Sequence, residues 1–320
     1  MAAGRALALA ALLAGALALP LLVGDYRAFQ LTLALVYAIA ILGLNILTGY
    51  NGQVSLGHGA FYALGAYTAA ILMSEDIAYY WTLPMAAAAG FGTGFLFGFP
   101  ALRLRGLYLA LATFALAVAT PQILKSGHLA EWTGGVQGVV VLKPDPPAGL
   151  PMSPDQWLYY VTLAALLLLS TAAWNLLRGR SGRAITAIRD NPVAAEAMGI
   201  DSALYKTLTF GVSAGYTSIA GALGAIVVQF VAPDSFTVFL SITLLVGVVV
   251  GGLASIPGAI FGGLFVQFVP NIAEQISKAA PWAIYGLFLI AFMYVMPYGI
   301  WGLVRRLLCQ GLRRRSASAG

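Results

Sequence analysis

Charged residues are scarce in this chain of 320 residues: only 9% are charged, while 60% are hydrophobic. So few polar side chains cannot cover the surface of a soluble globule of this size. The composition therefore excludes a water-soluble domain and predicts an integral membrane protein. The single cysteine, Cys309, also excludes an internal disulfide framework.

No Asp, Glu, Lys or Arg falls within the apolar runs of the sequence, and His58 is their only titratable side chain apart from tyrosines. Proton-coupled carriers usually place ionisable groups inside the bundle, at a cost of about 2.5 to 3.5 kcal/mol per charge on insertion scales. A proton relay is therefore not expected. Backbone carbonyls of broken helices could still hold Na⁺.

The phosphate-binding pattern G-x-x-x-x-G-K-[ST] is absent, so any ATP would have to be bound by a partner. Residues 211–215, GVSAG, match the nucleophile-elbow formula G-x-S-x-G, but they lie in an apolar run without a strand–turn–helix setting. We interpret these glycines as helix-packing positions. The chain is not expected to be an enzyme, to bind a cofactor or to hold a metal ion.

Long apolar segments recur instead along the whole chain, as helices that cross a bilayer core of about 30 Å require. We place about ten spans, at 7–23, 29–48, 55–73, 81–99, 107–124, 157–177, 207–231, 238–252, 259–269 and 282–304. The first run is longer than the core of a signal peptide, which favours a retained anchor over a cleaved signal. The expected fold is an all-α, polytopic bundle of about ten transmembrane helices, with broken helices, in one domain over residues 1–320.

Arg and Lys gather in the connection 178–206 and in the tail 305–320. The positive-inside rule places both segments in the cytoplasm, and ten spans then bring both termini to that side. We therefore interpret the net charge of +6 mainly as an indication of how the chain is oriented in the membrane. We expect the basic tail to contact lipid headgroups rather than nucleic acid.

Polar residues and glycines interrupt the apolar pattern at residues 49–61, GYNGQVSLGHGAF. Backbone freed at membrane depth must be buried in protein or line a wet cavity, so we expect a broken helix that faces the bundle interior. The N–H groups at the next helix start could receive a carboxylate. For His58, a structural hydrogen bond is favoured over ligand contact. The residues predicted to line a path for a small solute are Asn45, Thr48, Asn51, Gln53, Ser55 and His58.

A second break lies at residues 252–259, GLASIPGA, and it is similar to residues 52–60, GQVSLGHGA, with one residue inserted. Paired broken segments in two halves indicate an internal repeat. A shared richness in Gly, Ser and Ala would also explain the similarity, and both interpretations stay open at this stage.

The basic connection contains RDNPVAAEAMGID at residues 189–201, which carries the start and stop signals of a short helix. Asn191 can cap it, Pro192 suits its first turn and Gly199 suits its exit. A helix of about two turns is marginal alone and must dock on something. The partner is either the chain's own bundle or a separate cytoplasmic subunit.

Three ordered segments carry a family resemblance: LNILTGYNGQVSLGHGAF at 44–61, LRLRGLYLALAT at 102–113 and RDNPVAAEAMGI at 189–200. Together they resemble the LivM-type permeases of branched-chain amino acid ABC importers, over nearly the whole chain. Relatives of these permeases carry other amino acids, amides or urea. The alternative is an ion-coupled secondary carrier or facilitator for a small polar solute such as urea or an amide.

The resemblance implies a permease in the bacterial inner membrane that translocates branched-chain or related hydrophobic amino acids. It implies as partners a second homologous permease, two ATP-binding subunits on the cytoplasmic face and a periplasmic solute-binding protein. The segment 178–206 would then be the coupling loop to the ATP-binding subunits. The residues expected to form the coupling site are Arg189, Asn191, Ala195, Glu196, Met198 and Gly199.

Overall fold

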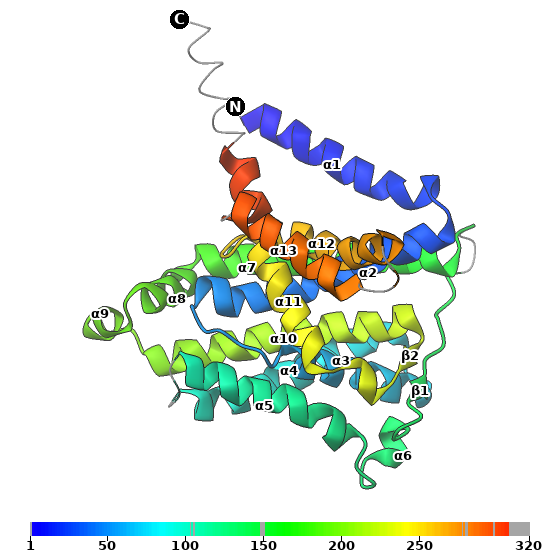
Figure 1. Ribbon diagram of the computed structural model, residues 1–320, viewed down its shortest axis with the longest axis horizontal. Coiled ribbons are helices and arrows are strands. Elements are labelled where there is room, and N and C mark those ends of the chain that lie inside the picture. The colour runs from blue at the N-terminus through cyan, green and yellow to red at the C-terminus, as the bar shows by residue number, and fades with distance from the viewer. Residues whose placement is uncertain are drawn as a thin grey trace, which may run out of the picture.

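The computed structural model describes residues 2–102, 104, 106–147, 151–276, 278, 281–296 and 298–306. Each of the ten expected spans overlaps one long helix in this part of the chain, although several of the bounds differ (Figure 1). These helices are α1 (Ala2–Leu22), α2 (Asp25–Asn45), α3 (His58–Ser74), α4 (Tyr79–Ala101), α5 (Leu107–Leu124), α7 (Pro154–Arg178), α10 (Ser202–Val228), α11 (Val238–Gly251), α12 (Ile256–Ile276) and α13 (Pro281–Val295).

Eight helical segments within the described ranges are long and apolar enough to cross a membrane. α3 falls just below that length, with 17 residues, because it begins at His58 rather than at the expected Ser55. The expected last span is interrupted: α13 ends at Val295, and residues 299–306 are helical again. The predicted helical bundle of about ten helices is confirmed. Most of the basic tail, residues 307–320 with Cys309, lies outside the described residues.

The span expected at 207–231 is too long at its end. α10 stops at Val228 because Gln229 takes a left-handed conformation with φ +64°. The next two residues form β2 (Phe230–Val231), which pairs antiparallel with β1 (Val139–Val140). The Val141 N–H extends this pairing by donating to the Gln229 carbonyl at 2.9 Å. The sequence did not predict this two-stranded ribbon, nor the short elements α6 (Ala130–Thr133) and η2 (Pro233–Ser235).

Two helices form the centre of the bundle, α2 and α10, and α10 packs directly against α2, α3 and α4. Their most apolar windows are 72% and 83% buried, against 28% for α4, α5 and α7. Backbones approach closely here. A Cβ at Gly65 of α3 would overlap the Ser218 carbonyl of α10, and one at Gly221 would overlap the Tyr62 carbonyl. The glycines predicted to pack, Gly211 and Gly215, face α4, where a Cβ on either would lie 3.2 Å from a backbone carbonyl.

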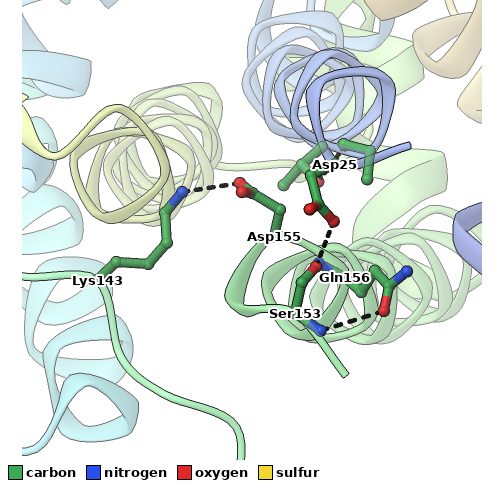
Figure 2. A network of polar contacts seen from close by, with 7 residues as sticks. Asp25, Lys143, Ser153, Asp155 and Gln156 are labelled. Carbon is green, nitrogen blue, oxygen red and sulfur yellow. Dashed lines mark hydrogen bonds and ion pairs between the residues drawn. The ribbon is translucent and has the colours of Figure 1, made fainter. Parts of the chain in front are cut away.

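A polar network joins the starts of α2 and α7 (Figure 2), at the end of the bundle opposite to the basic connection (Figure 1). Ser153 and Gln156 form a capping box, in which the Gln156 N–H donates to Ser153 Oγ at 3.3 Å. The Ser153 hydroxyl donates to Asp25 Oδ1 at 2.6 Å, and Lys143 pairs with Asp155 at 2.7 Å. The connection before α7 is therefore held against two helices.

Gly65→Ala is expected to destabilise the bundle by about 1 to 3 kcal/mol, because the added methyl group meets rigid backbone rather than a movable side chain. Thermal unfolding in detergent would measure the loss. Gly92→Ala in α4 is the control, since a Cβ there meets nothing within 4 Å. Equal unfolding temperatures for the two variants would contradict the close packing of α3 on α10.

Candidate functional site

The first break follows α2 without a gap. The chain passes through a π-helical turn, η1 (Ile46–Tyr50), and then runs without helix until α3 begins at His58. Gly52 takes φ +77°, a conformation that favours glycine, and a Cβ there would lie 2.8 Å from Arg189 Cγ. The expected broken helix is therefore observed. Half of residues 46–57 are buried, whereas Gly52 and Val54 are exposed.

Asn45 joins the first break to the second. Its side-chain N–H groups donate to the Ser255 carbonyl at 2.8 Å and the Gly252 carbonyl at 3.4 Å. Its Oδ1 accepts from the Ala254 N–H at 2.9 Å. Asn45 is 1% exposed, so water does not reach this site. The Asn45 amide instead supplies hydrogen-bond partners to backbone N–H and C=O groups that lie beyond the end of α11.

The two breaks are built alike. Gly52 and Gly252 both have positive φ, of +77° and +120°. Ser55 and Ser255 each accept, at 3.3 and 3.1 Å, from a backbone N–H two or three residues further on, where the next helix begins. These parallels support the internal repeat.

His58 is fully buried in a chain of hydrogen bonds that fixes its tautomer. The Ser213 hydroxyl donates its only hydrogen to the Gly43 carbonyl at 2.6 Å, so Ser213 Oγ must accept from His58 Nε2–H at 2.7 Å. His58 Nδ1 then accepts from the Ser55 hydroxyl at 2.9 Å. The prediction of a structural histidine rather than a ligand contact fits this arrangement, which ties α3 to α2 and α10.

The match to the nucleophile-elbow formula has no catalytic setting. Ser213 does lie beside a histidine, but it sits in the middle of α10 with no exposed surface and its proton is held by a carbonyl. Within the described residues, no group of three or more His, Cys, Asp and Glu side chains is placed to hold a metal ion.

The other predicted pathway residues also bond within the protein. Asn51 Nδ2 donates to Thr209 Oγ1 at 3.1 Å, and Gln53 Nε2 donates to Asn51 Oδ1 at 3.0 Å. The Thr48 hydroxyl donates to the Gln53 carbonyl at 3.0 Å. All six predicted residues thus lie around the two breaks, where each forms hydrogen bonds within the protein.

A pocket of about 280 Å³, which we call the inner pocket, joins the two predicted sets of residues. It is lined by Asn51 and Gln53 from the break, by Arg189 and Glu196 from the basic connection, and by Lys206. Charged side chains therefore meet the polar break at this end of the bundle.

The basic connection folds into α8 (Arg180–Asp190) and α9 (Pro192–Ala197), which form one end of the molecule (Figure 1). Asn191 caps α9 by accepting from the Ala194 N–H at 3.1 Å, and Pro192 occupies the first turn. Gly199 has φ +82° after the helix. The predicted short helix and its two end signals are confirmed.

α9 presents most of its side chains to solvent. Ala195 is the buried contact with the bundle, at 4% exposure, whereas Val193 and Met198 are 73% and 83% exposed. Glu196 is also exposed. α9 therefore contacts the rest of the bundle through Ala195 and leaves its other side chains open to solvent.

Arg189, the last arginine of α8, reaches from this end into the break. Its Nη1 donates to the Gly49 carbonyl at 3.1 Å, and its Nη2 pairs with Asp190 at 2.9 Å. The guanidinium therefore links the connection that carries α9 to the π-helical turn at the end of α2.

Several anchors of the break were not singled out from the sequence. The Leu56 N–H donates to Thr113 Oγ1 at 2.9 Å, and the Gly59 N–H donates to Ser241 Oγ at 2.8 Å. Their only sequence signal is a hydroxyl residue inside an apolar run, which is also common where the hydroxyl bonds its own helix.

Residues 26–297 match the family model described as branched-chain amino acid transport system, permease component. The chain belongs to this family. It is therefore a multi-pass membrane permease and a transport component rather than an enzyme, and it belongs to an ABC transporter complex. The family does not favour the alternative of an ion-coupled carrier.

Two curated relatives from Escherichia coli K12 illustrate the similarity. The permease is 32% identical to the high-affinity branched-chain amino acid transport system permease protein LivM, over 93% of this chain and 75% of LivM. It is 26% identical to LivH, a permease protein with the same system name, over 85% of this chain and 92% of LivH.

Among solved structures, the permease is similar to a metal-chelate type ABC transporter in an inward-facing conformation. The identity is 18%, the match covers 85% of this chain and 86% of that one, and the TM-score is 0.46.

Ser213→Ala is expected to destabilise the permease by about 1 to 3 kcal/mol, because it leaves both the His58 N–H and the Gly43 carbonyl without their partner. Thermal unfolding would measure the loss, and ¹⁵N NMR of labelled histidine should find the proton of His58 on Nε2. Ser74→Ala is the control, since its hydroxyl bonds only the Ile71 carbonyl at an exposed helix end. A proton on Nδ1 would contradict the hydrogen-bond chain.

Proposed function

We propose that this chain is the membrane-spanning permease of an ABC importer that moves branched-chain or related hydrophobic amino acids into the cytoplasm. The observation that carries the proposal is that two features adjoin in the chain: the exposed helix α9 and Arg189, which lies just before it. A solvent-facing helix suited to a partner lies at the basic end, and the arginine before it bonds the backbone of a broken membrane helix. Family membership and the printed names of LivM and LivH support the amino acid substrate.

Partners and orientation complete the proposal. Two ATP-binding subunits dock on the cytoplasmic face, one of them against α9, and a periplasmic solute-binding protein delivers the solute. A second homologous permease completes the membrane part. In E. coli, LivM and LivH are two permease proteins that carry one system name, which supports this pairing. The permease domain occupies residues 1–320 of an inner-membrane protein, both termini are cytoplasmic, and 178–206 is the coupling loop.

The hydrogen bonds provide a route for coupling. A displacement of α9 acts through Arg189 on the Gly49 carbonyl, and so on the first break. Asn45 carries the same displacement to the second break. ATP-driven closure below the membrane would thus move both breaks together and switch access by rigid-body rocking.

The chemistry of the six predicted pathway residues favours weak solute binding. Asn45, Thr48, Asn51, Gln53, Ser55 and His58 offer a zwitterion only neutral polar groups, carbonyls and helix ends. These residues line the path during the access change, when the present internal bonds are exchanged. Selectivity and affinity then rest mainly on the delivering protein.

Glu196→Lys is expected to abolish solute-stimulated ATP hydrolysis by the assembled complex, because it reverses the charge on the docking face of α9. The assay uses the cognate binding protein with leucine, aromatic amino acids and urea in turn. Glu196 is exposed, so the unfolding temperature should stay unchanged. Glu131→Lys, an equal charge change on exposed α6, is the control. ATP hydrolysis stimulated to the wild-type level in Glu196→Lys would refute the docking role of α9. Uptake against a concentration gradient by this chain without its partners would refute the proposal of an ABC importer.

Arg189→Gln is expected to lower the amino acid transported per ATP hydrolysed, since glutamine is too short to hold the Gly49 carbonyl while α9 stays intact for docking. Parallel measurements of ATP hydrolysis and labelled leucine uptake in proteoliposomes give this ratio. Arg27→Gln makes the same chemical change at an exposed site at the start of α2 and should leave it alone. An unchanged ratio in Arg189→Gln would remove this arginine from the coupling route.

A further inference from the structure

A second pocket, which we call the outer pocket, lies toward the end of the bundle opposite α9, where β2 follows α10 (Figure 1). Its volume is about 120 Å³. The walls come from α2, α3, α10, α11 and the connection between α10 and α11. They include Tyr37, Tyr62, Ala66, Gly224, Phe236 and Leu240.

Several wall residues of the outer pocket are buried and packed against one another. Ala66 and Phe236 are 1% and 6% exposed, and the Phe236 ring packs on Tyr62 with a centroid distance of 6.1 Å. Phe230 lines the pocket from β2, where pairing with Val140 holds it in place. No charged side chain lines this pocket within the described part of the chain.

Two phenol hydroxyls in this apolar pocket have no hydrogen-bond partner among the residues that the structure describes. They belong to Tyr37 and to Tyr62, which is 8% exposed. Another buried tyrosine of the bundle is satisfied: the Tyr216 hydroxyl donates to the Leu169 carbonyl at 3.0 Å. Gly224 leaves room for the Tyr62 hydroxyl, because a Cβ there would overlap it. Neither hydroxyl oxygen is among the sealed polar atoms of the bundle, so both are open to a ligand in the pocket that accepts a hydrogen bond.

The geometry points to the outer pocket as a subsite for the transported amino acid, an inference that rests on the proposed function. The branched side chain packs against Ala66, Phe236 and Leu240, and a carboxylate oxygen accepts from the two phenol hydroxyls. An apolar cavity of about 150 Å³ holds benzene, so about 120 Å³ suits a side chain of four carbons. An indole is too large for it.

The position of the outer pocket fits a solute in transit. Tyr62 lies one turn beyond His58 on α3, so this helix connects the first break to the pocket. Neutral donors hold a carboxylate without the strong attraction of a cation, which lets the solute leave toward the break.

Tyr62→Phe tests the hydroxyl, because it keeps the ring and removes the donor. In proteoliposomes with the complete complex and saturating binding protein, leucine uptake should fall roughly tenfold, as for a lost hydrogen bond to a charged group. Tyr67→Phe is the matched control. Tyr67 lies on the same helix, is 3% exposed and also has a hydroxyl without a partner among the described residues, but it does not line the pocket.

Ala66→Val tests the apolar wall by filling part of the pocket. Uptake of leucine relative to alanine should fall about tenfold, because the smaller side chain still fits. Ala70→Val adds the same volume one turn further along α3, at a site that is also 1% exposed but outside the pocket, and should leave the ratio unchanged. A general loss of stability would lower uptake of both amino acids together.

The outcomes separate this inference from the proposed function. If the wild-type complex takes up leucine but Tyr62→Phe behaves like Tyr67→Phe and Ala66→Val leaves the leucine-to-alanine ratio unchanged, the subsite is refuted and the importer stands. If the wild-type complex responds to no amino acid, the proposed function fails and the subsite fails with it.

Discussion

Backbone groups freed inside a membrane must find partners within the protein, because lipid offers none. Each helix break in this permease meets that demand with side chains from distant helices. Asn45 binds three backbone groups of the second break, while Thr113 and Ser241 take N–H groups of the first. The polar residues that interrupt the apolar sequence therefore serve first of all as hydrogen-bond partners that hold the breaks in place. The breaks are stable only because the surrounding helices supply these partners.

Close backbone packing decides which parts can move. Gly65 and Gly221 bring the backbones of α3 and α10 into direct contact, and Gly90 brings α4 close to the Ala214 carbonyl of α10. Helices that touch through their backbones cannot rotate separately without overlap, so α3, α4 and α10 behave as one body. The breaks, held by hydrogen bonds that can be exchanged, are the natural hinges beside it. This division supports rocking of rigid parts over local rearrangement as the way in which access changes.

The sequence predicted the features that local chemistry determines. Apolar length located the spans, glycine and asparagine located the first break, and Asn191 with Gly199 bounded α9. Tertiary partners left no such signal: Asn45 and Ser255 are 210 residues apart, and His58 and Ser213 are 155 apart. The β1–β2 ribbon is only two residues per strand, too short for an alternation pattern. A polar residue in an apolar run either has a hydrogen-bond partner within the protein or contacts the solute. The sequence alone does not distinguish these two cases.

The two pockets differ in charge, and this difference bears on direction. Arg189, Glu196 and Lys206 line the inner pocket, while the outer pocket is walled by neutral side chains. Fixed charges can make a zwitterion bind more tightly at one end of a path than at the other. A path that does not change its structure nevertheless carries solute only down the concentration gradient of that solute. Accumulation requires that the affinity or access of the two ends change in alternation, at the expense of another free-energy source. The direction of transport must therefore be set at a surface where such a source acts on the protein. We propose that this surface is the exposed face of α9, which Arg189 joins to the first break.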